Sequence, residues 1–207
     1  MSKGLILIGA GGHSRSCIDT IEREGSFKIA GLVGVNDDLG KNLFGHKVLA
    51  TDSGMRPLAE RYIYALLGMG QIDSPAHRIR LYELALEAGF LFPIIISPTA
   101  YVSPHAVIGA GTIVMHGAII NAGAIVGKNC IINSNALVEH DSQVSDHCHI
   151  STGAILNGNT SIGAGSFIGS GAVLKEGISI GAGSLVGMGV MVRKNLENGT
   201  IFSGEVK

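Results

Sequence analysis

A histidine flanked by two acidic residues, Glu139-His140-Asp141, is the strongest candidate for catalysis in this sequence. An imidazole exchanges its proton near neutral pH, and an adjoining carboxylate can hold its tautomer and raise its basicity. A single histidine in a turn is more often a solvated residue with no chemical role. Here further polar side chains gather within one stretch, and their company favours a catalytic role for His140. These neighbours are Asn133, Glu139, Asp141, His147 and His149.

The run His147-Cys148-His149 also suggests zinc, because imidazole and thiolate are both zinc ligands. In a strand, however, positions 147 and 149 point to one face and position 148 to the other. The three groups cannot converge simply on one ion, so no metal site is predicted. With Cys17 and Cys130 the cysteines are odd in number, in a chain without a secretion signal. We therefore expect reduced thiols that pack as small apolar side chains.

A glycine turn made by Gly9, Gly11 and Gly12 follows the first apolar run. Glycine lets backbone N–H groups approach a phosphate at the start of a helix, so the turn is a candidate nucleotide site. Its spacing departs from the dinucleotide pattern G-x-G-x-x-G, because Ser14 stands in place of the third glycine. A mononucleotide or nucleotide sugar therefore suits it better than NAD. Asp37 and Asp38, after the second predicted strand, are placed to accept hydrogen bonds from a ribose or base. The alternatives are a turn that binds nothing and an ordinary polar turn.

The second half of the chain is strictly periodic. Residues 100–195 divide without a gap into sixteen hexads such as AVIGAG and SFIGSG, each with an aliphatic third residue. A period of six predicts a parallel β-helix in which three hexads make one triangular coil, with Gly, Asn or Asp at the bends. An α-helix is excluded, because a spacing of six puts successive aliphatic residues on different faces and each glycine would cost about 1 kcal/mol.

Strands alternate with helices before the hexads, which predicts a small parallel α/β sheet, a Rossmann-like half domain. Ser14 is placed to cap the first helix. Pro98 marks the boundary, so the predicted domains are residues 1–97 and residues 98–207. We expect strands at 5–9, 28–35, 63–70 and 90–96, and helices at 14–24, 53–61 and 74–89.

The composition excludes some classes of function. The net charge is −1, so nothing attracts the chain to nucleic acid or to an anionic membrane. No run reaches the eighteen apolar residues of a membrane span, and the apolar run near the start is too short for a signal peptide. We expect a cytoplasmic protein.

The motifs together resemble a family of bacterial sugar acetyltransferases that join a Rossmann-like half domain to a left-handed β-helix. The family includes the PglD-like N-acetyltransferases of nucleotide-linked 4-amino sugars and the NeuD-like sialic acid O-acetyltransferases. The resemblance covers nearly the whole chain. It rests on IGAGGHS near the start, NDD after the second strand, and INSNALVEHDSQVSDHCHISTGAILNGNTSIGAGSFIGSGAVL in the hexads.

Carried over by position, the resemblance implies a role for each matching residue. His140 would be the general base, and Asp141 the acid that orients it, where PglD-like enzymes usually have Glu. His149 would lie near the acetyl-CoA thioester, with Asn133 in the family's Asn position before the base. The remaining residues implied are Gly158, Ser170 and Met188 for acetyl-CoA, and Gly11, Gly12, His13, Asp37 and Asp38 for the nucleotide.

The activity implied is acetyl-CoA-dependent N-acetylation of the C4 amine of a UDP-linked amino sugar for surface glycans, with GDP- or dTDP-linked sugars as alternatives. Acetyl-CoA would be a co-substrate, with no bound cofactor. The family is trimeric, with each active site between neighbouring β-helices. A sialic acid O-acetyltransferase is an alternative, because ISTGAILNG is similar to those enzymes, and a zinc enzyme of the γ-carbonic anhydrase kind is a more distant one.

The C-terminus departs from the family, which commonly ends in a G-x-P-A-K tail. Here the chain ends FSGEVK, without the proline and alanine. Arg193, Lys194 and Lys207 are left as candidates to bind the phosphates of CoA.

Overall fold

The computed structural model describes residues 3–204 and divides into two compact units. One unit contains the chain up to Gly70 and the range Ala76–Ile95. The other contains Gln71–Pro75 together with the chain from Ile96 onward. The short segment Gln71–Pro75 thus packs with the hexads although it lies within the first half of the sequence.

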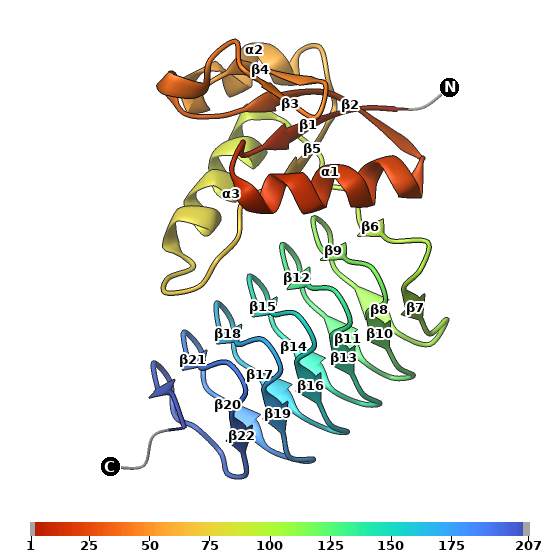
Figure 1. The fold of residues 1–207 in the computed structure, drawn as a ribbon, viewed down its shortest axis with the longest axis vertical. Coiled ribbons are helices and arrows are strands. Elements are labelled where there is room, and N and C mark those ends of the chain that lie inside the picture. The colour runs from red at the N-terminus through yellow and green to blue at the C-terminus, as the bar shows by residue number, and fades with distance from the viewer. Residues whose placement is uncertain (1–2, 205–207) are drawn as a thin grey trace. The chain divides into compact units, whose positions relative to one another are not determined.

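The first unit is a five-stranded sheet with the strand order β3-β4-β2-β1-β5. Strands β1, β2, β4 and β5 run parallel, whereas β3 is antiparallel to β4. The sheet is therefore mixed and not wholly parallel as expected, because a hairpin through Phe44 and Gly45, with φ of 49° and 89°, reverses the chain. Its strands are β1 (Lys3–Ile8), β2 (Phe27–Val33), β3 (Asn42–Leu43), β4 (His46–Ala50) and β5 (Tyr64–Leu67). Its α-helices, labelled in Figure 1, are α1 (Gly12–Glu24), α2 (Met55–Ala59) and α3 (Ala76–Ala88). Two short 3-10 helices, η1 (Asn36–Asp38) and η2 (Asp52–Gly54), complete the unit.

Two local expectations in this unit were wrong. The N-cap of α1 is Gly11, and Ser14 lies buried inside the helix, where its hydroxyl donates to the carbonyl of Gly68 at 2.8 Å. The range 90–96 is not a strand of the α/β sheet, since Leu91 makes only an isolated bridge to Tyr64 and Pro93 has no N–H to donate. Its last residues, Ile95–Ile96, form β6, the first strand of a β-helix sheet.

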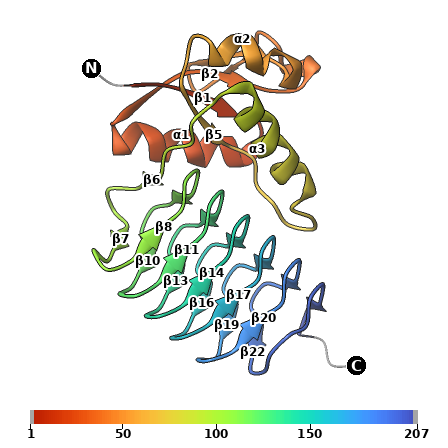
Figure 2. The same cartoon turned by 180° about the vertical axis from the view of Figure 1, so that it is seen from behind.

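The second unit is built of two-residue strands in three parallel sheets, an arrangement typical of a left-handed β-helix (Figures 1 and 2). Sheet 1 contains β7 (Tyr101–Val102), β10 (Ile119–Ile120), β13 (Leu137–Val138), β16 (Ile155–Leu156), β19 (Val173–Leu174) and β22 (Met191–Val192). Sheet 2 contains β8 (Val107–Ile108), β11 (Ile125–Val126), β14 (Gln143–Val144), β17 (Ser161–Ile162) and β20 (Ser179–Ile180). Sheet 3 contains β6, β9 (Ile113–Val114), β12 (Ile131–Ile132), β15 (His149–Ile150), β18 (Phe167–Ile168), β21 (Leu185–Val186) and β23 (Ile201–Phe202).

The predicted period sets the register of these sheets. Within the hexads each strand residue pairs with the residue eighteen positions on, as Ile120 does with Val138 and Val138 with Leu156. The last strand of sheet 3 departs from this register, since Val186 pairs with Phe202. The third residues of the hexads point inward and form one continuous apolar core. In fourteen of the sixteen hexads the sixth residue takes the bend with a left-handed φ; most are glycine, and Asp141, with φ of 60°, is one of the exceptions. Short polar side chains such as Asp tolerate this conformation better than other non-glycine residues do.

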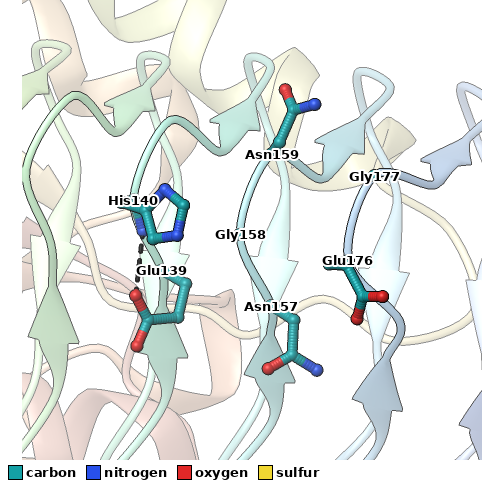
Figure 3. Close-up of a pocket in the computed structure, with 7 residues that line it drawn as sticks. All are labelled: Glu139, His140, Asn157, Gly158, Asn159, Glu176 and Gly177. Atoms are coloured by element: carbon teal, nitrogen blue, oxygen red, sulfur yellow. Dashed lines mark hydrogen bonds between the residues drawn. The ribbon is translucent and has the colours of Figure 1, made fainter.

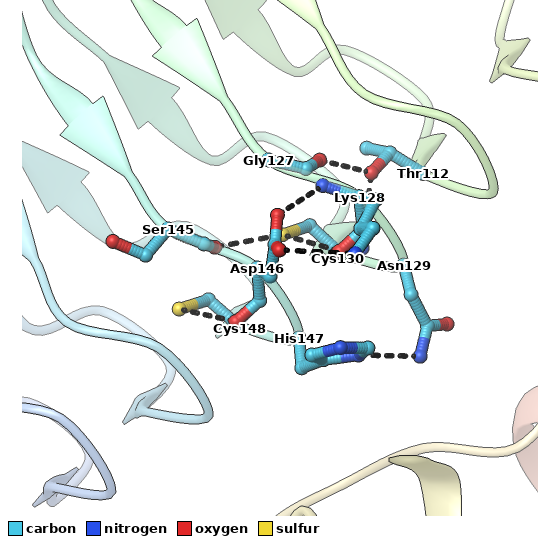
Figure 4. Close-up of polar contacts among 9 residues, drawn as sticks. All are labelled: Thr112, Gly127, Lys128, Asn129, Cys130, Ser145, Asp146, His147 and Cys148. Atoms are coloured by element: carbon cyan, nitrogen blue, oxygen red, sulfur yellow. Dashed lines mark hydrogen bonds and ion pairs between the residues drawn. The ribbon is translucent and has the colours of Figure 1, made fainter. Parts of the chain in front are cut away.

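Small side chains at the first hexad position join successive coils (Figure 4). Thr112 Oγ1 donates to the carbonyl of Gly127 at 2.7 Å, and Cys130 and Cys148 donate through Sγ to the carbonyls of Ser145 and Gly163, each at 3.2 Å. The two thiols thus do what hydroxyls do in other coils. The pKa of the Cys148 thiol is raised, first by its contact with Cys130 and then by burial.

The third cysteine lies in the α/β unit. Cys17 is buried in α1, and burial raises the pKa of its thiol to about 12. Among residues 3–204, no helix is both long enough and apolar enough to span a bilayer.

Candidate active site

His140 stands at the corner that follows β13, and its two neighbours in the chain hold it from both sides. The carboxylate of Asp141 accepts a hydrogen bond from ring Nδ1 at 2.9 Å, and the carboxylate of Glu139 accepts one from the backbone N–H of His140 at 3.0 Å. Because an ionised carboxylate only accepts, the proton of the neutral imidazole lies on Nδ1 and the lone pair lies on Nε2. The hydrogen bond to Asp141 is the main cause that raises the pKa of His140. The ring is thus oriented as a base whose free nitrogen is Nε2.

A pocket of about 550 Å³ opens beside this ring. Its lining comes from the same corner of three successive coils, shown in Figure 3: Glu139, His140, Asn157, Gly158, Asn159, Glu176 and Gly177. Five of these seven residues have a polar or charged side chain, and the side-chain amide of Asn157 donates to the carbonyl of Leu174 at 2.7 Å. Of the residues predicted to bind acetyl-CoA, Gly158 is the one that meets His140 here.

Asn133 and His149 meet each other on a different part of the coil. Asn133 Nδ2 lies 3.1 Å from Nε2 of His149, and Nδ1 of His149 lies 2.7 Å from the carbonyl oxygen of Gln71. The carbonyl can only accept, so Nδ1 carries the proton and Nε2 accepts from the amide. With both ring nitrogens engaged and 6% of its surface exposed, His149 is buried in this chain. Its role near a thioester stays a prediction.

Gln71 is a residue that the sequence patterns did not single out. It is 4% exposed, and its side-chain amide donates to the carbonyls of His147 and Gly165 at 2.9 and 3.2 Å. The backbone carbonyl of Gln71 accepts the hydrogen bond from Nδ1 of His149. A loop glutamine carries no recognisable spacing signal. The predicted helix at 74–89 begins three residues after Gln71, but that prediction does not indicate where Gln71 packs.

Ser170 and Met188 lie at the corners that follow sheet 3, whereas His140 lies at a corner that follows sheet 1. Ser170 Oγ lies 2.9 Å from Ser151 Oγ, and Met188 is 81% exposed. Within one chain the predicted acetyl-CoA residues therefore do not form one site. Lys207 lies outside the described residues.

The α/β unit holds a cavity of about 320 Å³ at the ends of β1 and β2. Gly11 and Asp38 both line it, together with Asp52 and His77. Gly11 is also the N-cap of α1, and no side chain caps this helix. The start of a helix favours an anion through its dipole.

The other predicted nucleotide residues do not line this cavity. Gly12 is the first residue of α1, His13 lies in its first turn close to Gly70, and Asp37 is exposed in η1. Of the two acids, Asp38 is the one turned toward the cavity, and it also pairs with Lys41 at 3.2 Å. No group of three or more His, Cys, Asp or Glu side chains within residues 3–204 is placed to hold a metal ion.

Comparison with family models finds three matches. Residues 4–83 match the PglD N-terminal domain, residues 105–140 match the bacterial transferase hexapeptide (six repeats), and residues 159–194 match the hexapeptide repeat of succinyl-transferase. A comparison with curated proteins gives no match.

Solved structures resemble nearly the whole chain. A histidine-to-asparagine variant of perosamine N-acetyltransferase from Caulobacter crescentus, in complex with CoA and GDP-perosamine, is 32% identical with a TM-score of 0.89, over 94% of this chain and 90% of that one. The acetyltransferase domain of PglB from Neisseria gonorrhoeae, in complex with acetyl coenzyme A, is 32% identical with a TM-score of 0.87, over 96% and 95%. WeeI from Acinetobacter baumannii shares the fold at 22% identity, with a TM-score of 0.82 over 95% of both chains.

A β-helix of hexapeptide repeats with a histidine–carboxylate pair at a corner, following an α/β unit, defines a hexapeptide-repeat acyltransferase. The chain belongs to the PglD-like family of nucleotide-sugar N-acetyltransferases and is an acetyltransferase.

Proposed function

We propose that this protein transfers an acetyl group from acetyl-CoA to the C4 amine of a nucleotide-linked amino sugar, with His140 as the general base. The observation that carries the proposal is the orientation of His140, whose Nδ1 is bound to Asp141 while its ring lines the pocket. An acyl transfer to an amine needs a base at the nucleophile and no metal ligand set, which matches a single oriented imidazole.

The reaction proceeds by direct transfer. Nε2 of His140 accepts a proton from the amine as its nitrogen forms a bond to the thioester carbonyl carbon. The carbon–sulfur bond then breaks, CoA leaves as a thiolate, and the imidazolium returns the proton to that sulfur. The base contributes about 10²- to 10⁴-fold to the rate, and alignment of the two substrates contributes more. The backbone N–H groups of Gly153 and His149 already donate to the carbonyls of Ser134 and Ser166, at 2.9 and 3.0 Å, so they are not proposed as donors to the oxyanion.

The α/β unit is proposed to bind the nucleotide. The uncapped start of α1 suits a diphosphate, and Asp38 in the cavity suits a base or ribose that donates hydrogen bonds. A UDP-linked sugar remains our first choice. GDP is the main alternative, because the Caulobacter relative is described with GDP-perosamine.

The active enzyme is proposed to be a homotrimer in the cytoplasm, with each site completed by a neighbouring copy. The outward residues of sheet 1 are all apolar, and Tyr101, Ile119 and Met191 are 55%, 39% and 61% exposed. On sheet 2 the outward residues include Gln143, Ser161 and Ser179. An apolar face next to the His140 corner is suited to packing against another copy. A second chain would also account for Ser170 and Met188 lying at a different corner from His140.

The test is an acetylation assay with a panel of UDP-, GDP- and dTDP-linked 4-amino sugars and acetyl-CoA. Its two readouts are the mass gain of the sugar and the release of free thiol from CoA. Wild-type protein is expected to acetylate one nucleotide class, and His140→Ala to lose about 10²-fold or more in kcat. His105→Ala, which removes an exposed histidine from an earlier corner, is the matched control and is expected to leave the rate unchanged. Full activity of His140→Ala would refute the role of His140 as the general base. An acetyl group found on a hydroxyl of the sugar would show that the enzyme is an O-acetyltransferase and refute the proposed N-acetylation.

A further inference from the structure

Gly158 is an exception in the repeat. Among the sixteen hexads it is the only glycine at the fifth position, where the same corner of other coils carries Ala122, His140, Glu176 and Lys194. The bend does not require glycine there, because the left-handed φ falls on the sixth position and Gly158 does not share it. Some other feature of the molecule must therefore exclude a side chain at this place.

The space that a side chain would occupy at position 158 is filled by the ring of His140. A Cβ atom built on Gly158 would lie 2.7 Å from Nε2, 2.8 Å from Cε1 and 3.3 Å from Cδ2 of that ring. These are the three nearest atoms, and two of the distances are shorter than real Cβ contacts allow. The imidazole thus lies against the backbone of the next coil. Figure 3 shows its ring projecting toward the coil that carries Gly158.

We propose that Gly158 is the positioning residue of His140: its missing side chain leaves a space, the seat, in which the ring lies with Nδ1 on Asp141 and lines the pocket. This inference rests on the proposed function, in which His140 is the base. It assigns Gly158 a role that acts through another residue and differs from lining the acetyl-CoA arm.

The seat can be removed without disturbing the fold. Alanine already occupies the equivalent position at Ala122, so the backbone of this corner accepts a Cβ. In Gly158→Ala the exposed ring of His140 has to swing away, which separates it from Asp141. A displacement of about 1 Å at a reacting group costs on the order of 10²-fold in rate.

The experiment uses the full-length protein and compares four proteins: wild type, Gly158→Ala, His140→Ala and the double variant. Ala182→Ser, which adds one atom at the fifth position of another corner, serves as the control. Kinetics with acetyl-CoA are combined with an NMR titration of the histidine Cε1–H signals, in which the spectrum of His140→Ala identifies the His140 signal among eight histidines.

We expect Gly158→Ala to melt within a few degrees of wild type and to lose about 10²-fold in kcat. It should also lower the apparent pKa of His140, which the hydrogen bond to Asp141, and then the charge of Glu139, otherwise raise. In the His140→Ala background the same substitution should change the rate by no more than about twofold, since both changes remove one interaction. An unchanged His140 titration in Gly158→Ala, or an equal loss in both backgrounds, would overturn the proposal. The titration needs no substrate, so it tests the seat even if His140 proves not to be the base.

Discussion

Nδ1 of His140 lies 2.9 Å from Oδ2 of Asp141, although the two residues are consecutive in the chain. They share one corner of the β-helix, where Asp141 takes a φ of 60°. Both side chains are largely exposed, at 63% and 68%, so water screens their attraction. The pair therefore contributes to the orientation and basicity of the imidazole more than to the stability of the fold.

Replacing Asp141 with asparagine should change the pH dependence of catalysis. The hydrogen bond to a carboxylate raises the pKa of His140 above its usual value, so the wild-type base becomes active only as the pH rises through this raised pKa. Asp141→Asn removes the negative charge and should move the acidic limb of kcat/KM to lower pH, with a lower plateau because the base is weaker. The measurement is a pH profile of kcat/KM for both proteins. An acidic limb that stays in place would contradict the assignment.

Replacing Gln71 with alanine should lower the stability of the second unit. The substitution removes both hydrogen bonds from the side-chain amide to the carbonyls of His147 and Gly165, and the site is buried. We expect a loss of about 1–3 kcal/mol in the free energy of unfolding, measured by denaturant titration. The exposed Gln143→Ala is the matched control, with an expected change within about 0.5 kcal/mol. Equal losses in the two variants would show that the Gln71 contacts do not stabilise the fold.

The thiol of Cys148 should be replaceable by a hydroxyl but not by a methyl group. Cys148 Sγ donates to the carbonyl of Gly163, as the hydroxyl of Ser166 does to the carbonyl of Gly181 in the next coil. Cys148→Ser keeps a donor, and its free energy of unfolding should lie within about 1 kcal/mol of the wild-type value. Cys148→Val removes the donor and should lower the free energy of unfolding by about 1–3 kcal/mol. Unfolding by denaturant in a reducing buffer compares the two. A more stable valine variant would show that the thiol acts only as an apolar filler.

A charge in the middle of sheet 1 should disrupt the proposed trimer. Ile155 lies at the centre of the apolar outward column, so Ile155→Glu would place a carboxylate where the copies are proposed to pack. We expect smaller species in sedimentation velocity and a loss of acetyl transfer. Gln143→Glu puts the same group on sheet 2 and should leave the assembly intact. An Ile155→Glu protein that sediments like wild type would exclude sheet 1 as the interface.

Much of the fold followed from local patterns in the sequence. The six-residue period predicted the β-helix and its inward aliphatic residues, because each coil repeats the same short-range constraints of strand and bend. The alternation of apolar runs placed α1, β2, β5 and α3 close to their observed bounds. The hairpin of β3 and β4 was missed, since β3 has only two residues and β4 buries only Val48, so neither has a clear alternation.

The candidate site divides in the same way. Sequence alone determined that His140 has a carboxylate on each side, because consecutive residues at a bend cannot lie far apart. Only the tertiary structure decided that Gly158, one coil further on, supports the ring, and that Gln71 reaches His149 across 78 positions. It also showed that Ser14, predicted as a helix cap, is a buried residue whose hydroxyl donates to the carbonyl of Gly68, 54 positions away. Such contacts depend on how coils stack and loops pack over long separations, and no local preference of the residues involved encodes the partner that packing brings to them.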